Sequence, residues 1–255
     1  MIATFSVSEG QLREGTAQGR QKGEKMSNKQ NINYFKMNDL MEYIGIGFMG
    51  VALPLFIFAY GITWIISCAM LPIGVILFII GVSIRSSDKD IISSLKRKTE
   101  GVVIPYDNLG INERRINRRL PIEILEDFEY ENGVMLKKSK KGIVYTSKYT
   151  KTALYLLTDA LYISTKTVSL ISDEAKDRRL EIPYASIEEV RLDRNEKSIS
   201  FDKKVFNVVE ERLVIRHSGG YKLSVPIHVD VKAKAVVEKI QRQIEIYKKN
   251  SDNIH

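Results

Sequence analysis

The chain is poor in cysteine and lacks the signature motifs of common enzyme classes. Cys68 is the only cysteine among 255 residues, which excludes an intrachain disulfide and a cysteine-based metal site. There is no P-loop, no G-x-S-x-G motif and no dinucleotide-binding fingerprint. The three histidines, His217, His228 and His255, do not stand at metal-ligand spacing. We therefore expect no catalytic residues, no metal and no cofactor, and we expect that the protein is not an enzyme.

One long segment of the chain has no charged residues. No Asp, Glu, Lys, Arg or His occurs in the 42 residues from Tyr43 to Ile84. One helix of this length would extend about 63 Å, about twice the hydrocarbon thickness of a bilayer. Two passes fit better, with helices at 42–60 and 65–84. Between them Tyr60 and Trp64 flank a glycine, and both are suited to the membrane interface.

Basic residues predict the orientation of this transmembrane hairpin. Lysines and arginines are frequent on its C-terminal side, Lys29 and Lys36 lie shortly before it, and the tip has neither. Because cytoplasmic flanks are enriched in Lys and Arg, we expect a multi-pass protein of the inner cell membrane with both termini in the cytoplasm. The residues concerned are Lys29, Lys36, Arg85, Lys89, Lys96, Arg97 and Lys98.

Two kinds of export signal are alternatives to a membrane hairpin. A secretory signal has an apolar core of about 7–15 residues close to the N-terminus, whereas this apolar block is longer and begins later. The stretch from Ile65 to Cys68 fits a lipoprotein signal loosely, and such a signal would place the C-terminal region outside the cell. The apolar run continues past Cys68 to Ile84, which favours the hairpin.

The polar segments on either side of the hairpin have different characters. Residues 1–41 are rich in polar and small residues, so we expect a disordered leader, within which Met26 is a candidate start. Residues 85–119 begin with apolar residues at helical spacing among charges, which predicts a juxtamembrane helix followed by a basic linker.

Residues 120–250 change to a period of two, which is typical of strands. A tight turn at 158–160 and the sequence Ser218, Gly219, Gly220 indicate hairpins, and residues 167–178 read as a polar loop. A helix is expected at about 230–248, where Asp230 can cap its start. The other strand candidates are 122–131, 134–138, 143–147, 153–157, 161–165, 180–182, 187–193, 198–201, 212–217 and 221–225.

Two motifs in this region resemble those of bacterial pleckstrin-homology-like (PH-like) and GRAM domains. The stretch 154–163, LYLLTDALYI, resembles their L-x-L-T-D-x-R-L hairpin, although Ala160 stands near a position that is often charged. The stretch 182–190, IPYASIEEV, is similar to their I-P-x-x-x-I-x-x-V strand. The resemblance covers roughly residues 120–248. It implies an α+β protein in which the hairpin precedes a PH-like antiparallel β-barrel capped by a C-terminal helix. Such domains bind lipid headgroups or proteins, or they assemble into oligomers.

Two basic clusters are the candidate binding residues. Each basic side chain beside an anionic membrane contributes about 1 kcal/mol, and a solvated surface remains the alternative for both clusters. Nucleic acid is disfavoured, because the clusters lack interleaved aromatic residues. The members are Arg114, Arg115, Arg118 and Arg119 at helical spacing, and Lys137, Lys138, Lys140 and Lys141 near a hairpin.

The sequence thus predicts a membrane-anchored binding or scaffold module on the cytosolic face. Its ligand would be a protein partner, another copy of the chain or an anionic headgroup. The alternative is a small auxiliary subunit of a membrane complex or transporter, in which the hairpin would carry the function.

Overall fold

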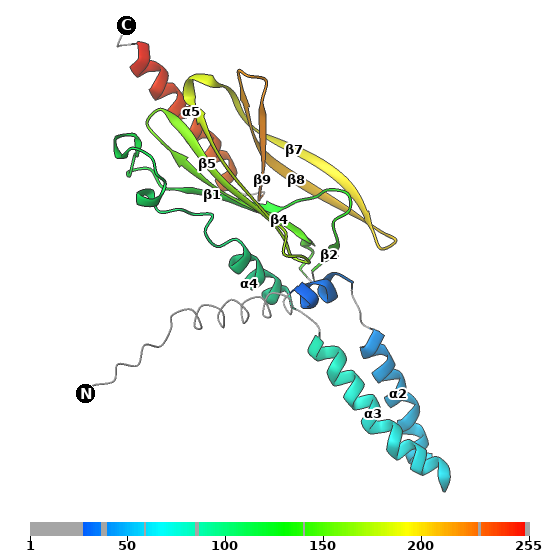
Figure 1. Ribbon diagram of the computed structural model, residues 1–255. Helices are drawn as coiled ribbons and strands as arrows, with labels where there is room; N and C mark the ends of the chain where they lie inside the picture. The colour runs from blue at the N-terminus through cyan, green and yellow to red at the C-terminus, as the bar shows by residue number, and fades with distance from the viewer. Residues whose placement is uncertain are drawn as a thin grey trace, which may run out of the picture. The chain divides into compact units, whose positions relative to one another are not determined.

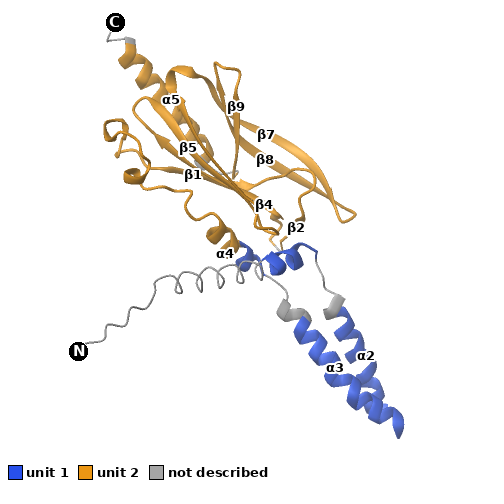
Figure 2. Ribbon diagram, viewed as in Figure 1, with its two compact units in different colours: residues 1–91 blue, residues 92–255 orange. Residues whose placement is uncertain are grey.

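The computed structural model describes residues 28–36, 40–58, 60–84, 87–139, 141–228 and 231–252. The chain divides into two compact units, Met1–Ile91 and Ile92–His255 (Figure 2). Unit 1 is helical where it is described, and unit 2 combines antiparallel sheets with helices. The predicted α+β class is therefore confirmed.

Unit 1 contains a helical segment at 28–36 in addition to the two apolar helices. The expectation of a disordered leader does not hold for this segment. Tyr34 is buried, and its hydroxyl donates a 2.7 Å hydrogen bond to Asp88 Oδ1. This contact gives residues 28–36 a partner elsewhere in unit 1, and the composition of the segment does not predict such a partner. The candidate start at Met26 lies outside the described residues.

The apolar helices α2 (Leu40–Phe58) and α3 (Ile62–Ile84) lie side by side as an antiparallel pair (Figure 1). The turn between them includes Gly61, whose φ of +71° suits glycine. The helices approach closely at Gly45, where an added Cβ would lie 2.6 Å from the backbone nitrogen of Phe78. An added Cβ on Gly47 would instead meet open space.

Only α3 is both long and apolar enough to cross a membrane, within the part of the chain that the structure describes. The qualifying stretch is Ile62–Ile80. The apolar part of α2, Tyr43–Phe58, is shorter; at about 1.5 Å per residue it measures about 24 Å, below the 30 Å or so of a bilayer core. The second membrane-crossing helix of the predicted hairpin is thus not shown. Near the tip, Trp64 stacks on Phe56 with ring centroids 5.8 Å apart, and Tyr60 is exposed.

The boundary between the units, after Ile91, falls within α4 (Asp88–Lys98). Unit 2 contains two main antiparallel sheets (Figure 1). Four strands follow the spatial order β1-β4-β5-β6, three follow β7-β8-β9, and β2 pairs with β3. The bounds are β1 Glu123–Phe128, β2 Leu136–Lys138, β3 Val144–Thr146, β4 Lys148–Leu156, β5 Ala160–Ser169, β6 Ala175–Pro183, β7 Ile187–Phe201, β8 Lys204–His217 and β9 Lys222–Ile227.

The predicted closed barrel is not found among the described strands. Strand β6 pairs with β5, and β7 pairs with β8, but no ladder joins β6 to β7. The chain leaves the first sheet at Pro183, which cannot donate a ladder hydrogen bond. It then forms the 3-10 helix η3 (Tyr184–Ser186) before β7 begins. The two sheets therefore meet through side chains.

The terminal helix α5 (Val231–Asp252) completes the core between the sheets. Its buried stripe is Ala233, Val236, Ile240 and Ile244, which pack with apolar residues of both sheets. This confirms the helix predicted from apolar spacing. The proposed cap, Asp230, lies outside the described residues.

Two stretches of unit 2 differ from the expected elements. The polar loop predicted at 167–178 is mostly strand, because β5 continues to Ser169 and β6 begins at Ala175. Strands β7 and β8 form one long hairpin in place of the separate short strands that were predicted. Its turn contains Asp202 and Lys203, both with positive φ (48° and 60°).

The segment between α4 and β1 packs as part of unit 2. Val102 and several partly buried residues that follow it contact Ala153, Tyr155 and Leu157 in a cluster of their own. The Tyr155 hydroxyl accepts a 2.6 Å hydrogen bond from the Ile104 N–H and donates a 2.9 Å bond to the Ile104 carbonyl. The basic linker expected here is therefore fixed along the four-stranded sheet.

Candidate functional site

The predicted arginine cluster does not converge on one surface. Only Glu113–Arg115 forms a short 3-10 helix, so the four arginines are not on one α-helical face. The Arg115 guanidinium contacts Asp159 at 2.9 Å and Glu181 at 2.5 Å, and it serves to join elements of unit 2. Arg118 lies 2.7 Å from Asp107. Arg114 and Arg119 are exposed.

The predicted lysine cluster is also dispersed. Lys137 and Lys138 are successive residues of β2, so their side chains point to opposite sides of the strand. Lys137 is half-buried and makes an interaction of its own, whereas Lys138 and Lys141 are exposed. Lys140 lies outside the described residues. The structure thus leaves Lys138 and Lys141 as the solvated members.

A different polar site lies in the interior of unit 2. Strands β4 and β5 pair Thr150 with Thr167 and Thr152 with Thr165. The hydroxyl oxygens are 2.8 Å apart in the first pair and 3.0 Å apart in the second. The same strands carry Leu154, Leu156, Leu161 and Ile163 in the apolar core. The sheet therefore changes from an apolar half to a hydroxyl-lined half.

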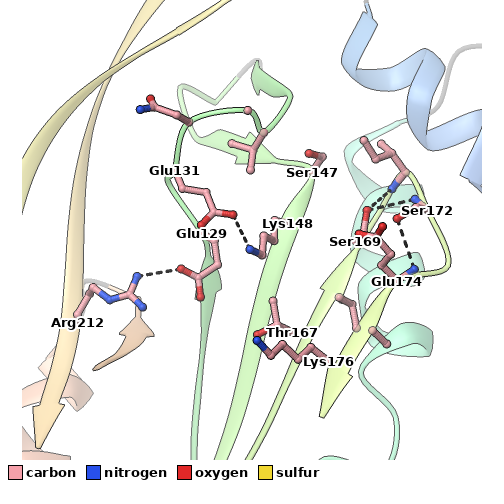
Figure 3. A pocket seen from close by; sticks show the side chains of 16 residues that line it. Glu129, Glu131, Ser147, Lys148, Thr167, Ser169, Ser172, Glu174, Lys176 and Arg212 are labelled. Atoms are coloured by element: carbon pink, nitrogen blue, oxygen red, sulfur yellow. Dashed lines mark hydrogen bonds and ion pairs between the residues drawn. The ribbon is translucent and has the colours of Figure 1, made fainter. Parts of the chain in front are cut away.

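An ion network joins this polar half to β8. Arg212 Nη1 lies 2.9 Å from Glu129 Oε2 (Figure 3), and it lies 2.8 Å from Glu210 Oε1. Glu210 is almost fully buried, and its second oxygen lies 2.5 Å from Lys197 Nζ. Two carboxylates thus meet two cations, as a buried charge requires.

Two hollows adjoin the network. The larger, of about 820 Å³, is lined by residues of β4, β5 and β6, by the β1–β2 and β5–β6 loops, by Ser147 and by Arg212 (Figure 3). The smaller, of about 170 Å³, lies between β5–β6 and β9. Both are lined by Glu129, Thr167 and Lys176, so the two hollows lie next to each other at these residues.

The cations of β6 distinguish the smaller hollow. Lys176 and Arg178 are two residues apart in the strand and stand opposite Thr167 and Thr165, so both line this hollow. Both side chains are exposed at the rim of the hollow, and neither makes an ion pair with a carboxylate in the described parts of the chain. The Arg178 guanidinium instead lies over the Tyr221 ring, 5.1 Å from its centroid.

A third hollow, of about 350 Å³, contains a buried acid. It is lined by Asp127 and His228 among others, with His228 Nδ1 3.9 Å from Asp127 Oδ1. Burial raises the pKa of the Asp127 carboxyl to about 6, although the Phe128 N–H and the nearby His228 favour its ionised form. Neighbouring Glu210 and Glu129 raise this pKa further.

Sequence reasoning missed Lys176 and Arg178 because they fell within the predicted polar loop. The signal was the alternation Lys176, Arg178, Leu180, Ile182, which has the period of a strand. Four charged residues in a row at 176–179 concealed it. In the described chain no group of three or more His, Cys, Asp or Glu residues could hold a metal ion.

No protein-family model, curated protein or solved structure matches this chain. The likeness to PH-like and GRAM domains therefore depends on the two sequence motifs, and it stays a prediction.

Proposed function

We propose that this protein is a membrane-anchored binding module that is not an enzyme. The α2–α3 pair would anchor the chain in the inner membrane, and unit 2 would bind its ligand on the cytosolic face. The observation that carries the anchor is the surface of α3, where only 11% of the qualifying stretch Ile62–Ile80 is buried. Large apolar side chains left exposed over this length are costly in water and favourable in lipid.

The exposed face of α2 supports the same proposal. Phe58 is 78% exposed and Ile57 is 59% exposed. Continuous apolar surface of this kind marks a membrane or protein contact. With the basic residues that follow α3, the arrangement favours a hairpin with both ends in the cytoplasm.

At the two hollows beside the ion network, a binding role is favoured over catalysis by how the acids of the network are held. Glu129 and Glu210 are occupied by Arg212, and Glu210 also by Lys197. A general base needs a free lone pair within reach of a substrate proton. What remains open in these two hollows is a surface of hydroxyls and of cations without carboxylate partners among the described residues, which suits recognition.

The PH-like assignment belongs to this proposal. Two antiparallel sheets whose shared core is completed by a C-terminal helix are in keeping with it, and so is the order of the two sequence motifs. In such a module the barrel-like unit presents a ligand site, and the preceding helices hold that site at the membrane.

Membrane insertion and orientation can be tested by carbonate extraction and by labelling of introduced cysteines, because only one native cysteine has to be replaced. Membranes from expressing cells are washed with alkaline carbonate, and the protein should stay in the pellet. In a Cys68→Ser background, cysteines are then introduced singly as Tyr60→Cys and Lys222→Cys. A membrane-impermeant maleimide should label the first in intact cells and the second only after permeabilisation. Release by carbonate would contradict the anchor, and the reverse labelling would contradict the orientation.

A further inference from the structure

The smaller hollow has an excess of positive charge. Glu129, Glu210, Arg212 and Lys197 form a network with two negative and two positive charges. Once that network is counted as neutral, Lys176 and Arg178 are left without carboxylate partners among the described residues that line the hollow. A hollow with two uncompensated cations attracts an anion of matching charge.

The threonine chain supplies no donor at Thr167. A threonine hydroxyl has one hydrogen, and Thr150 donates its hydrogen to Glu129 Oε1 at 2.7 Å. In the 2.8 Å contact between Thr150 and Thr167, Thr167 must therefore be the donor. The direction of this chain is fixed toward Glu129, so an anion must find its donors elsewhere.

Ser224 on β9 provides such a donor. Its Oγ accepts a 2.7 Å hydrogen bond from Arg212 Nε, and no described residue accepts the hydrogen of its hydroxyl. Ser224 lines the same hollow as Lys176 and Arg178. The site therefore offers an ammonium, a guanidinium and a hydroxyl, contributed by two strands of different sheets.

The Arg178 guanidinium is held in place before any ligand arrives. It lies over the Tyr221 ring at 5.1 Å from the centroid, a contact that favours this position of the guanidinium without using its hydrogen-bond donors. Arginine held in this way can bind two oxygens of one phosphate group. Such preorganisation lowers the loss of side-chain entropy on binding.

We propose that the hollow between β6 and β9 binds the phosphate group of a phosphomonoester through Lys176, Arg178 and Ser224. Its volume of about 170 Å³ is several times the 30 Å³ or so of one water, so the hollow has room for a phosphate group. A doubly charged anion with several oxygens matches two cations and one hydroxyl. The remainder of the ester would extend past Lys176 into the larger, hydroxyl-lined hollow.

This inference gives the proposed binding role a ligand class and depends on that role, but it does not depend on the membrane anchor. The phosphomonoester could be a lipid headgroup or a soluble metabolite. The experiment uses the full chain in micelles of an uncharged detergent and isothermal titration calorimetry. The probes are inorganic phosphate, short-chain phosphatidic acid as a lipid monoester, and short-chain phosphatidylglycerol as an anionic diester.

The decisive variant is Lys176→Gln/Arg178→Gln, matched by Lys138→Gln/Lys141→Gln, which removes two exposed cations of the β2–β3 hairpin. The first should weaken binding of inorganic phosphate and of phosphatidic acid by about tenfold or more, because two charge-assisted hydrogen bonds are lost. The control should change binding by less than about twofold. Arg178→Lys keeps the charge but loses the two-pronged geometry, and it should fall between them.

The probes separate the sources of the ligand. Phosphatidic acid binding more tightly than inorganic phosphate would identify a lipid headgroup, and equal binding would identify a soluble phosphomonoester. Phosphatidylglycerol binding as tightly as phosphatidic acid would overturn the proposal, since only surface charge would be involved. Absence of binding by both inorganic phosphate and phosphatidic acid would overturn it too, as would a loss caused by the β2–β3 control variant alone. The carbonate wash of the same variants keeps a failed anchor distinct from a failed site.

Discussion

Arg212 Nη1 lies 2.8 Å from Glu210 Oε1, and that carboxylate is only 1% exposed. An ionised carboxylate in such a place is tolerated only while it is paired and hydrogen-bonded. Arg212 also contacts Glu129 and donates to both Oγ and the carbonyl oxygen of Ser224. One guanidinium therefore links β8 to the end of β1 and to β9.

Replacing Arg212 with methionine should destabilise unit 2 strongly. The change keeps much of the side-chain volume but leaves Glu210 buried with Lys197 as its remaining cation. Breaking a buried pair by removing one partner costs about 3–5 kcal/mol. Urea unfolding of the chain in micelles, followed by the β-sheet signal in circular dichroism, measures this loss.

The matched control is the double variant Arg212→Met/Glu210→Gln. Neutralising both partners removes the unpaired charge, so the double variant should be more stable than Arg212→Met alone. A single variant within about 1 kcal/mol of the wild type would show that the network does not hold the sheets together.

The raised pKa of Asp127 predicts a specific pH dependence of stability. Its carboxyl titrates near 6 in the folded chain and near 4 when unfolded. The folded state therefore binds the proton more tightly, and the free energy of unfolding falls as pH rises from about 4 to about 6. The loss is about 2–3 kcal/mol, complete above this window and absent below it.

The variant Asp127→Asn isolates this effect, because the amide oxygen can still accept the 2.8 Å bond from the Phe128 N–H. Urea titrations at several pH values from 4 to 7 should show that the variant lacks the wild-type decline in this range. Glu188→Gln, an exposed position, is the control. Identical pH profiles for the wild type and Asp127→Asn would contradict the assignment.

The two hydrogen bonds between Tyr155 and Ile104 should fix the segment that precedes β1. Tyr155→Phe leaves the Ile104 N–H and carbonyl without this partner, at a cost of about 1–3 kcal/mol. Hydrogen exchange should rise near residue 104 before it rises in the strands. Tyr162→Phe is a close control, because Tyr162 packs on Tyr155 at 5.7 Å but lies partly exposed. Equal protection in both variants would refute the role of the hydroxyl.

Local patterns in the sequence predicted α2, α3, α5 and most of the hairpins, but not the helical segment at 28–36. The stripe Ala233, Val236, Ile240 and Ile244 has helical spacing, and the structure buries all four in one core. The uncharged run from Tyr43 likewise predicted the positions of α2 and α3 within a few residues. These features depend on neighbours along the chain, which periodicity reports directly.

Long-range partners could not be read from the sequence. Arg115 appeared to be a binding residue, yet Asp159 and Glu181, which neutralise it, are distant along the chain. The β7–β8 turn has no glycine, although Asp202 and Lys203 both adopt positive φ, a conformation that glycine and asparagine usually occupy. The candidate site depends on which strands lie side by side, and only the fold determines this.

Two glycines of α2 allow the helix pair itself to be tested. An added Cβ on Gly45 would lie 2.6 Å from Phe78 N and 2.9 Å from the Gly74 carbonyl oxygen, both backbone atoms that cannot turn aside. Gly45→Ala should therefore push the helices apart and cost about 1–3 kcal/mol. Gly47 faces open space, so Gly47→Ala should be neutral or stabilise the helix by up to about 1 kcal/mol. Titration with sodium dodecyl sulfate in mixed micelles, followed by circular dichroism, measures both changes. Equal effects of the two substitutions would show that α2 and α3 do not pack through Gly45.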